Sequence, residues 1–472
     1  MHDMDRRAFM ARAARASALG AFAHASHASE SVAATALDWR LTPIADSAVY
    51  ARRRPMRGAL YCERSNKTFL SWMGHDCHPY VMAYNHGTGG WAGPLRVGTS
   101  QAQSFNKWPV MVQDAAGVVH VFYGAHNAQL RHSVSPAPGA IEGQWNDTGI
   151  GVTERASYPM PVCAANGDLY VFYRFTDRRG PDFRPYVYIK STDNGRSWSE
   201  PARAIWHETP RPHNLNEIYV GAVVEQPAGE HGPERFLISW SIAGGGPDQA
   251  RHVAYTKDIY CAAFTPSDDM FYSVGGAELG AFIDDPDAYQ HCLAYDTGEL
   301  DPEARRATFW HTVAPSFNPA NGNPLVAFGI LNKDKVEITG DGRDDWHQEI
   351  QYDGKVAIWD DGRWVHRDVA EELPIKAIQQ CGADCFRAYC GTDGVHVFNS
   401  TDGGRTWAAE VTLHARNAAM FNVVDNARPE IKVLVTQREQ PRQGGRPGHS
   451  PDDYRQNFQV WTLGVGPLAT PA

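Results

Sequence analysis

The amino-acid sequence predicts an all-β fold, and three observations lead to this expectation. From residue 40 onward, short runs of β-branched and aromatic residues follow one another, each bounded by Gly, Asn or Asp. Glycine (43) and proline (30) are abundant, as a hairpin-rich fold requires. Helical periodicity is scarce, and the best helical candidate is the short stretch 284–289.

Four runs show the strand pattern most clearly. They are rich in Val, Ile, Tyr, Phe and Trp and end at turn residues: 118–123 (VVHVFY), 169–173 (LYVFY), 236–240 (FLISW) and 395–398 (VHVF). Such residues suit the pleated, half-buried surface of a sheet, so each run is expected to be a β-strand.

An eight-residue segment occurs twice, as STDNGRSW at 191–198 and as STDGGRTW at 400–407. In this pattern the Asp carboxylate accepts backbone N–H bonds, Gly supplies a positive φ and Trp packs against the sheet, so each copy is expected to be a hairpin turn. The segment resembles the Asp-box, or BNR repeat, of β-propellers, with weaker echoes at 84–91 and 359–364. The spacing leaves room for about four blades of ~40–50 residues between the two copies.

The length of the chain suits a single propeller. The sequence has 472 residues, and removal of an N-terminal signal leaves roughly 440, which fits seven blades better than several domains. We therefore expect residues 40–466 to form one seven-bladed β-propeller with Asp-box hairpins.

Composition and charge exclude several classes of protein. Lys+Arg (44) are fewer than Asp+Glu (54), giving a net charge of −10, which argues against a nucleic-acid binder because such proteins need clustered cations. No apolar run reaches the ~18–20 residues of a membrane-spanning helix. Hydrophobic residues make up 43% of the chain, enough for a large core. We expect a monomer.

The N-terminus has the pattern of an export signal. An Arg-Arg pair at 6–7 precedes a weakly apolar, alanine-rich stretch, and Ala-His-Ala at 23–25 resembles a cleavage site. We expect residues 1–30 to be a Tat-type signal peptide, which would make the mature protein periplasmic or secreted. The alternative is an alanine-rich helical tail in which the Arg-Arg pair occurs by chance.

Eight cysteines are compatible with an oxidising compartment. The close spacing of Cys381, Cys385 and Cys390 favours a local disulfide, with the pairing left open. No pair of CxxC motifs indicates a zinc ribbon.

The sequence does not specify a metal site. His291, Cys292 and His311 are residue types that bind zinc, but their spacing matches no standard ligand set, and packed core residues are the alternative. A structural zinc or calcium ion is left open, and no feature of the sequence requires a cofactor for catalysis.

The densest cluster of reactive side chains lies within 104–219 and has a repeated layout. Polar residues precede a Pro-led strand (SFNKWP, 104–109), and others follow the neighbouring strand (YGAHN, 123–127). The same order recurs with SYP at 157–159 and FYR at 172–174. In a propeller, such positions lie at loops where the inner strands converge on the central cavity, so we expect a site there.

The segment 71–221, with its Asp-box, resembles the BNR-4-type propellers, and further matches lie at 186–193, 270–273 and 291–296. That family includes the ulvan lyases and related enzymes that act on rhamnose–uronate linkages. The resemblance implies a seven-bladed catalytic domain that cleaves an anionic, uronate-containing polysaccharide by β-elimination. The product would carry a 4,5-unsaturated uronate end.

The same resemblance assigns site residues. His126 matches the histidine of a G-x-H motif, Tyr158 matches the tyrosine of Y-P, and Arg174 matches an arginine that binds the carboxylate; these three are expected to be catalytic. Tyr219 matches a further tyrosine and is expected to bind substrate. Asn106 stands where ulvan lyases usually carry a second histidine, and it can hydrogen-bond a carboxylate but cannot titrate.

His213, between Pro212 and Asn214, is a further candidate for contact with the substrate. Each candidate also has an ordinary alternative when its residue type is considered alone. A tyrosine before proline is usually a packed aromatic, and an arginine at a strand end is usually a solvated surface charge.

The chemistry explains why these residue types would occur together. Loss of the C5 proton of a uronate leaves a carbanion that spreads onto an already anionic carboxylate, and Arg174 would stabilise that charge with a bidentate fork. Asn106 would add a neutral hydrogen bond. Tyr158 or His126 would remove the proton, and a neighbouring group would protonate the departing O4. A nearby arginine is one way to lower the pKa of a tyrosine that acts as a base.

Other functions compatible with a propeller are left open. A sialidase-like glycosidase would need an early Arg-Ile-Pro motif, whereas the early Arg-Pro here is at 54–55 and no Arg-Ile-Pro occurs. A hydrolase acting on a rhamnose–glucuronate cap is a nearer alternative. A non-catalytic glycan-binding propeller would keep the aromatic residues without depending on Tyr158 or Arg174.

Overall fold

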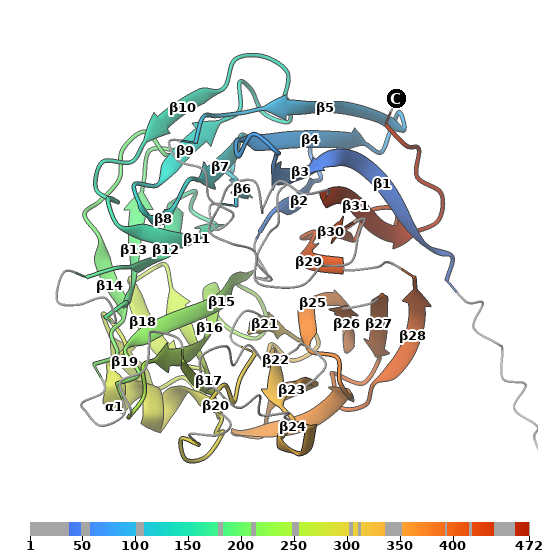
Figure 1. The fold of residues 1–472 in the computed structure, drawn as a ribbon. Helices are drawn as coiled ribbons and strands as arrows, with labels where there is room; N and C mark the ends of the chain where they lie inside the picture. Colours follow the sequence, from blue (N-terminus) through green and yellow to red (C-terminus); the bar gives the residue numbers. More distant parts are fainter. Residues whose placement is uncertain are drawn as a thin grey trace, which may run out of the picture. The chain divides into compact units, whose positions relative to one another are not determined.

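Seven antiparallel sheets arranged in a ring form the unit Asp38–Ala472 (Figure 1). The computed structural model describes residues 37–48, 57–100, 108–177, 183–208, 214–247, 254–301, 305–309, 313–335, 352–391, 394–414, 418–438 and 458–471. Within these ranges nearly all regular structure is β. The predicted seven-bladed β-propeller is therefore confirmed.

The sheets, called blades here, follow one another along the chain, and most have four strands in simple up-and-down order. Blade 1 comprises β2 (Ala59–Cys62), β3 (Lys67–Met73), β4 (Pro79–Asn85) and β5 (Gly90–Arg96); blade 2 comprises β6 (Val110–Gln113), β7 (Val119–Tyr123), β9 (Arg131–Val134) and β10 (Asn146–Gly149). Blade 3 comprises β11 (Ala156–Cys163), β12 (Leu169–Phe175), β13 (Tyr186–Ser191) and β14 (Ala202–Ile205), and the short β8 (His126–Ala128) pairs with β11.

The second half of the ring continues this order. Blade 4 comprises β15 (Glu217–Gln226), β16 (Arg235–Gly244), β17 (Tyr255–Thr265), β18 (Met270–Ser273), β19 (Glu278–Gly280) and β20 (Leu293–Tyr295). Blade 5 comprises β21 (Ala314–Phe317), β22 (Pro324–Leu331), β23 (Tyr352–Asp360) and β24 (Arg363–Ala370); blade 6 comprises β25 (Ile375–Gly382), β26 (Cys385–Gly391), β27 (Val395–Ser400) and β28 (Ala408–Leu413). The four strand runs expected from the sequence are found in β7, β12, β16 and β27.

Blade 7 joins the two ends of the propeller. Its strands β29 (Ala418–Val423), β30 (Val433–Arg438) and β31 (Phe458–Val465) come from the end of the chain, and β1 (Trp39–Ala48) comes from its beginning. β1 pairs antiparallel with β31, from Trp39 opposite Val465 to Ala48 opposite Phe458. This pairing hydrogen-bonds the first strand to the last one and so closes the ring.

Both Asp-box segments form the expected hairpin turns. The Asp402 carboxylate accepts hydrogen bonds from the Thr406 N–H (2.9 Å) and hydroxyl (2.6 Å), and the Ser400 hydroxyl accepts one from the Gly404 N–H (2.9 Å). Asp193 makes the equivalent bonds in the other copy. The two Asp-boxes and the two weaker echoes all join the third and fourth strands of their blades, namely blades 3 and 6 and blades 1 and 5.

Each Asp-box hairpin also packs on the blade that precedes it. A Cβ on Gly195 would lie 2.7 Å from the His132 ring of blade 2, and a Cβ on Gly404 would lie 2.6 Å from Leu325 of blade 5. Both glycines have positive φ, so conformation and space both require glycine. In blade 3, Trp198 packs edge-on against His132, with 5.7 Å between ring centroids. The repeats therefore hold neighbouring blades together.

A half-buried arginine links parts of four blades. Arg57 stands before blade 1, and its guanidinium donates to the Pro161 carbonyl of blade 3 (3.0 Å) and to Glu225 of blade 4 (2.6 Å). It also donates to Asp425, which follows β29 of blade 7, over 3.1 Å. Burial opposes its charge, but Asp425 and Glu225 outweigh burial and raise the pKa of Arg57.

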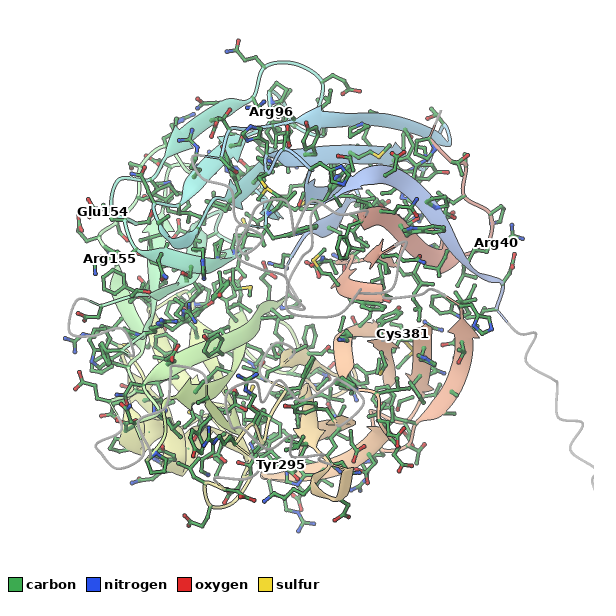
Figure 2. The ribbon with its side chains drawn as sticks, viewed as in Figure 1. Arg40, Arg96, Glu154, Arg155, Tyr295 and Cys381 are labelled. Atoms are coloured by element: carbon green, nitrogen blue, oxygen red, sulfur yellow. A yellow bond between two sulfur atoms is a disulfide. The ribbon has the colours of Figure 1, made fainter. Side chains whose placement is uncertain are left out.

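Two smaller expectations are also confirmed. The short helical stretch appears as α1 (Asp285–Asp287), capped by the Asp284 side chain and followed by a π-helical turn (η1, Ala288–Cys292); a 3-10 turn (η2) spans Lys333–Lys335. Cys381, labelled in Figure 2, forms a disulfide with Cys385 across the hairpin between β25 and β26. None of the helices in the described part of the chain has the length and apolar character to cross a bilayer.

The Asp-box geometry predicts a stability effect. Asp402→Ala removes the acceptor of the hydrogen bonds that shape its hairpin, so the free energy of unfolding should fall by about 1–3 kcal/mol. Chemical denaturation of the purified protein measures this change. Asp46→Ala, which removes an exposed carboxylate from β1, is the control and should leave the stability within about 0.5 kcal/mol. Equal stability of the two variants would contradict the assigned role.

Candidate active site

Three adjacent strands bring His126 and Arg174 to the same end of blade 3. In the register of the sheet, Ser157 of β11 lies opposite His126 of β8 on one side and opposite Arg174 of β12 on the other. Tyr158 follows Ser157, and Tyr219 lies near the start of β15 in the next blade. The structure therefore brings together four of the six residues expected from the sequence.

The backbone at Tyr158 is unusual for a tyrosine. Its φ is +60°, in the left-handed region, and the pairing of β11 with β12 shifts register between Ser157 and Met160. Pro159 has no N–H to donate, so the sheet hydrogen bonds are interrupted at this bulge. A non-glycine residue in this conformation costs on the order of 1 kcal/mol and is maintained by the surrounding structure.

The Arg174 guanidinium lies between two tyrosine rings. Its Cζ is 4.6 Å from the ring centroid of Tyr158 and 4.8 Å from that of Tyr219. The rings of His126 and Tyr158 are 5.7 Å apart. Arg174 is only 1% exposed, and both tyrosines are buried as well. The four side chains thus form one cationic and aromatic cluster, called the Arg174 cluster below.

The Arg174 guanidinium has unused hydrogen-bonding capacity. Among the described residues, its Nε and Nη1 are buried and have no hydrogen-bond partner. Burial opposes its charge, but Tyr219, Tyr158 and Glu217 outweigh burial and raise the pKa of Arg174, so the group stays protonated. A buried, charged group with two unpaired donor nitrogens is suited to bind an anion.

A second ion pair, which sequence reasoning missed, stands behind Tyr219. Glu217 is fully buried, and its carboxylate accepts a hydrogen bond from the Tyr219 hydroxyl (3.3 Å) and pairs with Arg184 Nη1 (3.0 Å). Glu217 and Tyr219 are two residues apart on β15 and so share one face of the strand. The two-residue spacing of Glu217 and Tyr219 was the available signal in the sequence. This spacing does not distinguish a buried glutamate from a solvated one.

Asn127 is another residue that sequence reasoning missed. It adopts a positive φ of 52°, which asparagine tolerates, and its N–H donates to the Ser157 hydroxyl over 2.9 Å. Its side-chain oxygen accepts a hydrogen bond from Thr176 (2.5 Å). These contacts link the strand of His126 to the strands of Tyr158 and Arg174.

Two of the expected substrate-binding residues, Asn106 and His213, lie outside the described residues, as does His311. Cys292 is buried in the core of blade 4. Within the part of the chain that the structure describes, no group of three or more His, Cys, Asp or Glu side chains could hold a metal ion.

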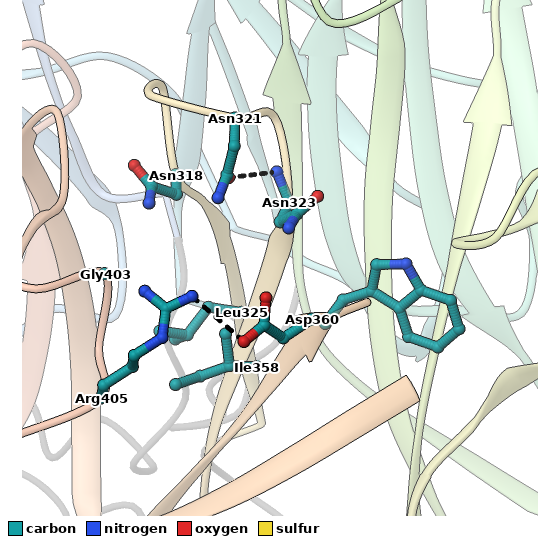
Figure 3. A pocket seen from close by; sticks show the side chains of 9 residues that line it. Asn318, Asn321, Asn323, Leu325, Ile358, Asp360, Gly403 and Arg405 are labelled. Atoms are coloured by element: carbon teal, nitrogen blue, oxygen red, sulfur yellow. Dashed lines mark hydrogen bonds and ion pairs between the residues drawn. The ribbon is translucent and has the colours of Figure 1, made fainter. Parts of the chain in front are cut away.

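A small polar cavity lies away from the Arg174 cluster, between blades 5 and 6 (Figure 3). Asn318, Asn321 and Asn323 line one side, and Arg405 donates to Asp360 across the other over 3.1 Å. About 10 Å³ is open to water, which is room for about one water molecule. This cavity is too small for a sugar and belongs to the packing around the second Asp-box.

Sequence comparison finds similar proteins of known activity. A protein named Ulvan Lyase-PL25, from Pseudoalteromonas sp. (strain PLSV), is 24% identical over 418 residues, covering 79% of this chain and 78% of that protein. An ulvan lyase from Alteromonas sp. (strain LOR) is 25% identical over 416 residues and covers 79% of each.

Structure comparison finds the same fold. The solved structure of a PL25 ulvan lyase bound to -[GlcA(1-4)Rha3S]- superposes with a TM-score of 0.70 at 21% identity, covering 89% of this chain and 95% of that one. The polysaccharide lyase Uly1 superposes with a TM-score of 0.58 at 12% identity, covering 91% and 99%.

The fold and the Arg174 cluster together define an Asp-box β-propeller with a buried cationic and aromatic site. The model of the BNR repeat-containing family (BNR_4) matches residues 67–371. The chain belongs to this family.

Two buried donor nitrogens of Arg174 have no partner among the described residues. We therefore expect Arg174 to lower the stability of the protein while it provides a site for an anion. Arg174→Met replaces a buried guanidinium with an apolar side chain of similar length, so the free energy of unfolding should rise by about 1 kcal/mol or more. Denaturant titration measures the change. Arg57→Met is the control, because the guanidinium of the half-buried Arg57 is fully paired. That variant should lose about 3 kcal/mol or more; a loss of similar size in both variants would contradict the interpretation.

Proposed function

We propose that this protein is a polysaccharide lyase that cleaves a uronate-containing polysaccharide, of rhamnose–glucuronate type, by β-elimination. The observation that carries the proposal is the Arg174 guanidinium, buried between Tyr158 and Tyr219 with two N–H groups free among the described residues. A lyase acting on uronates needs a buried cation at the carboxylate and proton-transferring groups beside it, and the Arg174 cluster contains both.

Arg174 would bind the substrate carboxylate through its two free N–H groups. Removal of the C5 proton spreads negative charge from C5 onto the carboxylate, so the charge on the substrate grows next to the guanidinium in the transition state. The low dielectric of the buried site strengthens this interaction. The arginine therefore stabilises the enolate-like transition state more than the ground state, as catalysis requires.

Proton transfer would involve Tyr158, His126 and Tyr219. Burial raises the pKa of Tyr219 to about 12, partly offset by Arg174 and reinforced by Glu217, so this hydroxyl keeps its proton at neutral pH. Tyr219 therefore meets the substrate as a neutral phenol, whose single O–H is donated to Glu217 in this structure. Removal of the C5 proton falls to Tyr158 or His126, and the proton then goes to the departing O4, which breaks the glycosidic bond.

The similar proteins support the substrate class. Two of them are named ulvan lyases, and one solved relative carries an oligosaccharide of glucuronate linked to sulfated rhamnose. Asn106 in place of the family's second histidine removes a titratable group from the expected site. The polymer should therefore be identified with a panel of ulvan, glucuronan, rhamnogalacturonan-like, gum-arabic-like and bacterial uronate polymers.

The proposal includes export and the absence of a catalytic cofactor. The Arg-Arg pair and the alanine-rich stretch before residue 30 support a Tat-type signal. Each proposed step uses side chains of this chain alone. A structural zinc or calcium ion stays an expectation that metal analysis of the purified protein can decide.

The test is the ultraviolet absorbance of the unsaturated uronate formed on each polymer. Tyr158→Phe removes a hydroxyl from the Arg174 cluster and should lower kcat by about 100-fold or more. Tyr272→Phe, which removes a hydroxyl bonded to Asp268 on a hairpin of blade 4, is the matched control and should keep wild-type activity. New reducing ends without new absorbance would instead indicate a hydrolase. Binding without cleavage of any polymer would indicate a glycan-binding propeller.

A further inference from the structure

Glu217 is an acidic residue in a site that must accept an anionic substrate. It is fully buried at the start of β15, and one oxygen of its carboxylate meets both Arg184 (3.0 Å) and the Tyr219 hydroxyl (3.3 Å). A buried carboxylate is costly unless it is paired, and nothing in the pairing of β15 with β16 requires a charge at this position. Its contact with Tyr219 indicates a role in the site.

The partner of Glu217 is held in place by the backbone. The Arg184 N–H donates to the Asn216 carbonyl (2.9 Å), and the Ile218 N–H donates to the Arg184 carbonyl (3.0 Å). The segment before β13 is therefore bonded to the start of β15 on both sides of Glu217. Backbone and side chains together fix the Glu217 carboxylate against Tyr219.

We propose that Glu217, fixed by Arg184, is a positioning residue that keeps Tyr219 a neutral hydrogen-bond donor beside Arg174, so that the Arg174 guanidinium keeps its full charge for the substrate carboxylate. This inference rests on the proposed function, because it assigns a role within the same site.

The charges around Tyr219 support this role. The groups that face it are Arg174 from β12, Tyr158 from β11, Glu217 from β15 and Arg184 from the segment before β13. Without Glu217, the charged groups that the described residues place around the hydroxyl would be two guanidinium groups, and the tyrosinate would form more readily. A tyrosinate beside Arg174 would neutralise it and repel a carboxylate. With Glu217 present, Arg184 is neutralised and the positive charge of Arg174 remains.

The decisive experiment is a spectroscopic titration of tyrosinate, which needs no activity. Glu217→Gln keeps an acceptor oxygen and removes the charge, so Tyr219 should ionise about one pH unit or more below its wild-type value. The extra tyrosinate signal must disappear in Glu217→Gln/Tyr219→Phe. Asp360→Asn, in the Arg405–Asp360 pair between blades 5 and 6 (3.1 Å), is the control and should titrate as wild type, with circular dichroism confirming the fold at each pH.

A second variant keeps the proposal testable if the single variant does not fold. Glu217→Gln/Arg184→Gln removes both charges and leaves Tyr219 facing Arg174 alone. The pH of Tyr219 ionisation should then still lie below the wild-type value, because the Arg174 charge remains and the Glu217 charge is gone. A wild-type titration in either folded variant would overturn the proposal.

Lyase kinetics give an independent readout. In Glu217→Gln, KM for the polymer should begin to rise at a lower pH than in the wild type, because tyrosinate neutralises Arg174, whereas a purely structural defect would lower kcat at every pH alike. A uniform loss of kcat would overturn the positioning role. If the wild type cleaves no polymer, the proposed function fails, and the tyrosinate titration still decides whether Glu217 controls Tyr219.

Discussion

The Arg57 contacts hold together the two blades that carry the candidate site. The guanidinium binds Glu225 at one end of β15 and the Pro161 carbonyl of β11, the two strands that carry Tyr219 and Tyr158. Strands in different blades share no sheet hydrogen bonds, so their separation is set by contacts across the blade boundary. A half-buried, fully paired arginine at that boundary is directional in a way that apolar packing is not, and it links the two strands a few residues along from Tyr158 and Tyr219.

The candidate site has more positive than negative groups, whereas the chain as a whole is acidic. The net charge is −10, yet the buried groups nearest the site include Arg174 and Arg184 and one carboxylate. Under the proposed function, the net charge would repel an anionic polymer at long range and the Arg174 cluster would attract it at one point. Salt screens the long-range repulsion by surface charges more than the attraction to Arg174, because Arg174 is buried.

The fold was largely predictable from the sequence, and the site only partly so. Asp-boxes are local: a hydroxyl, a carboxylate and a glycine within eight residues determine the turn, so two copies identify the architecture. Tyr158 and Arg174 lie beside recognisable strands. Glu217 and Asn127 carry no local signal, because their roles arise from contacts with Arg184 and Thr176, which are distant in the sequence. Asn106 and His213 fall outside the described residues, so their predicted roles stay predictions.

The closure of blade 7 has a consequence for how the protein forms. Thr42 of β1 and Thr462 of β31 meet across 420 positions of the chain, so the ring can close only after nearly all of the protein has been synthesised. Contacts of such long range form slowly, because the entropy of closing a large loop is lost before the contacts are gained. Until then the first strand has no partner and its edge is open to aggregation. The Tat-type export proposed above would suit a chain of this topology, because that route carries proteins that have already folded.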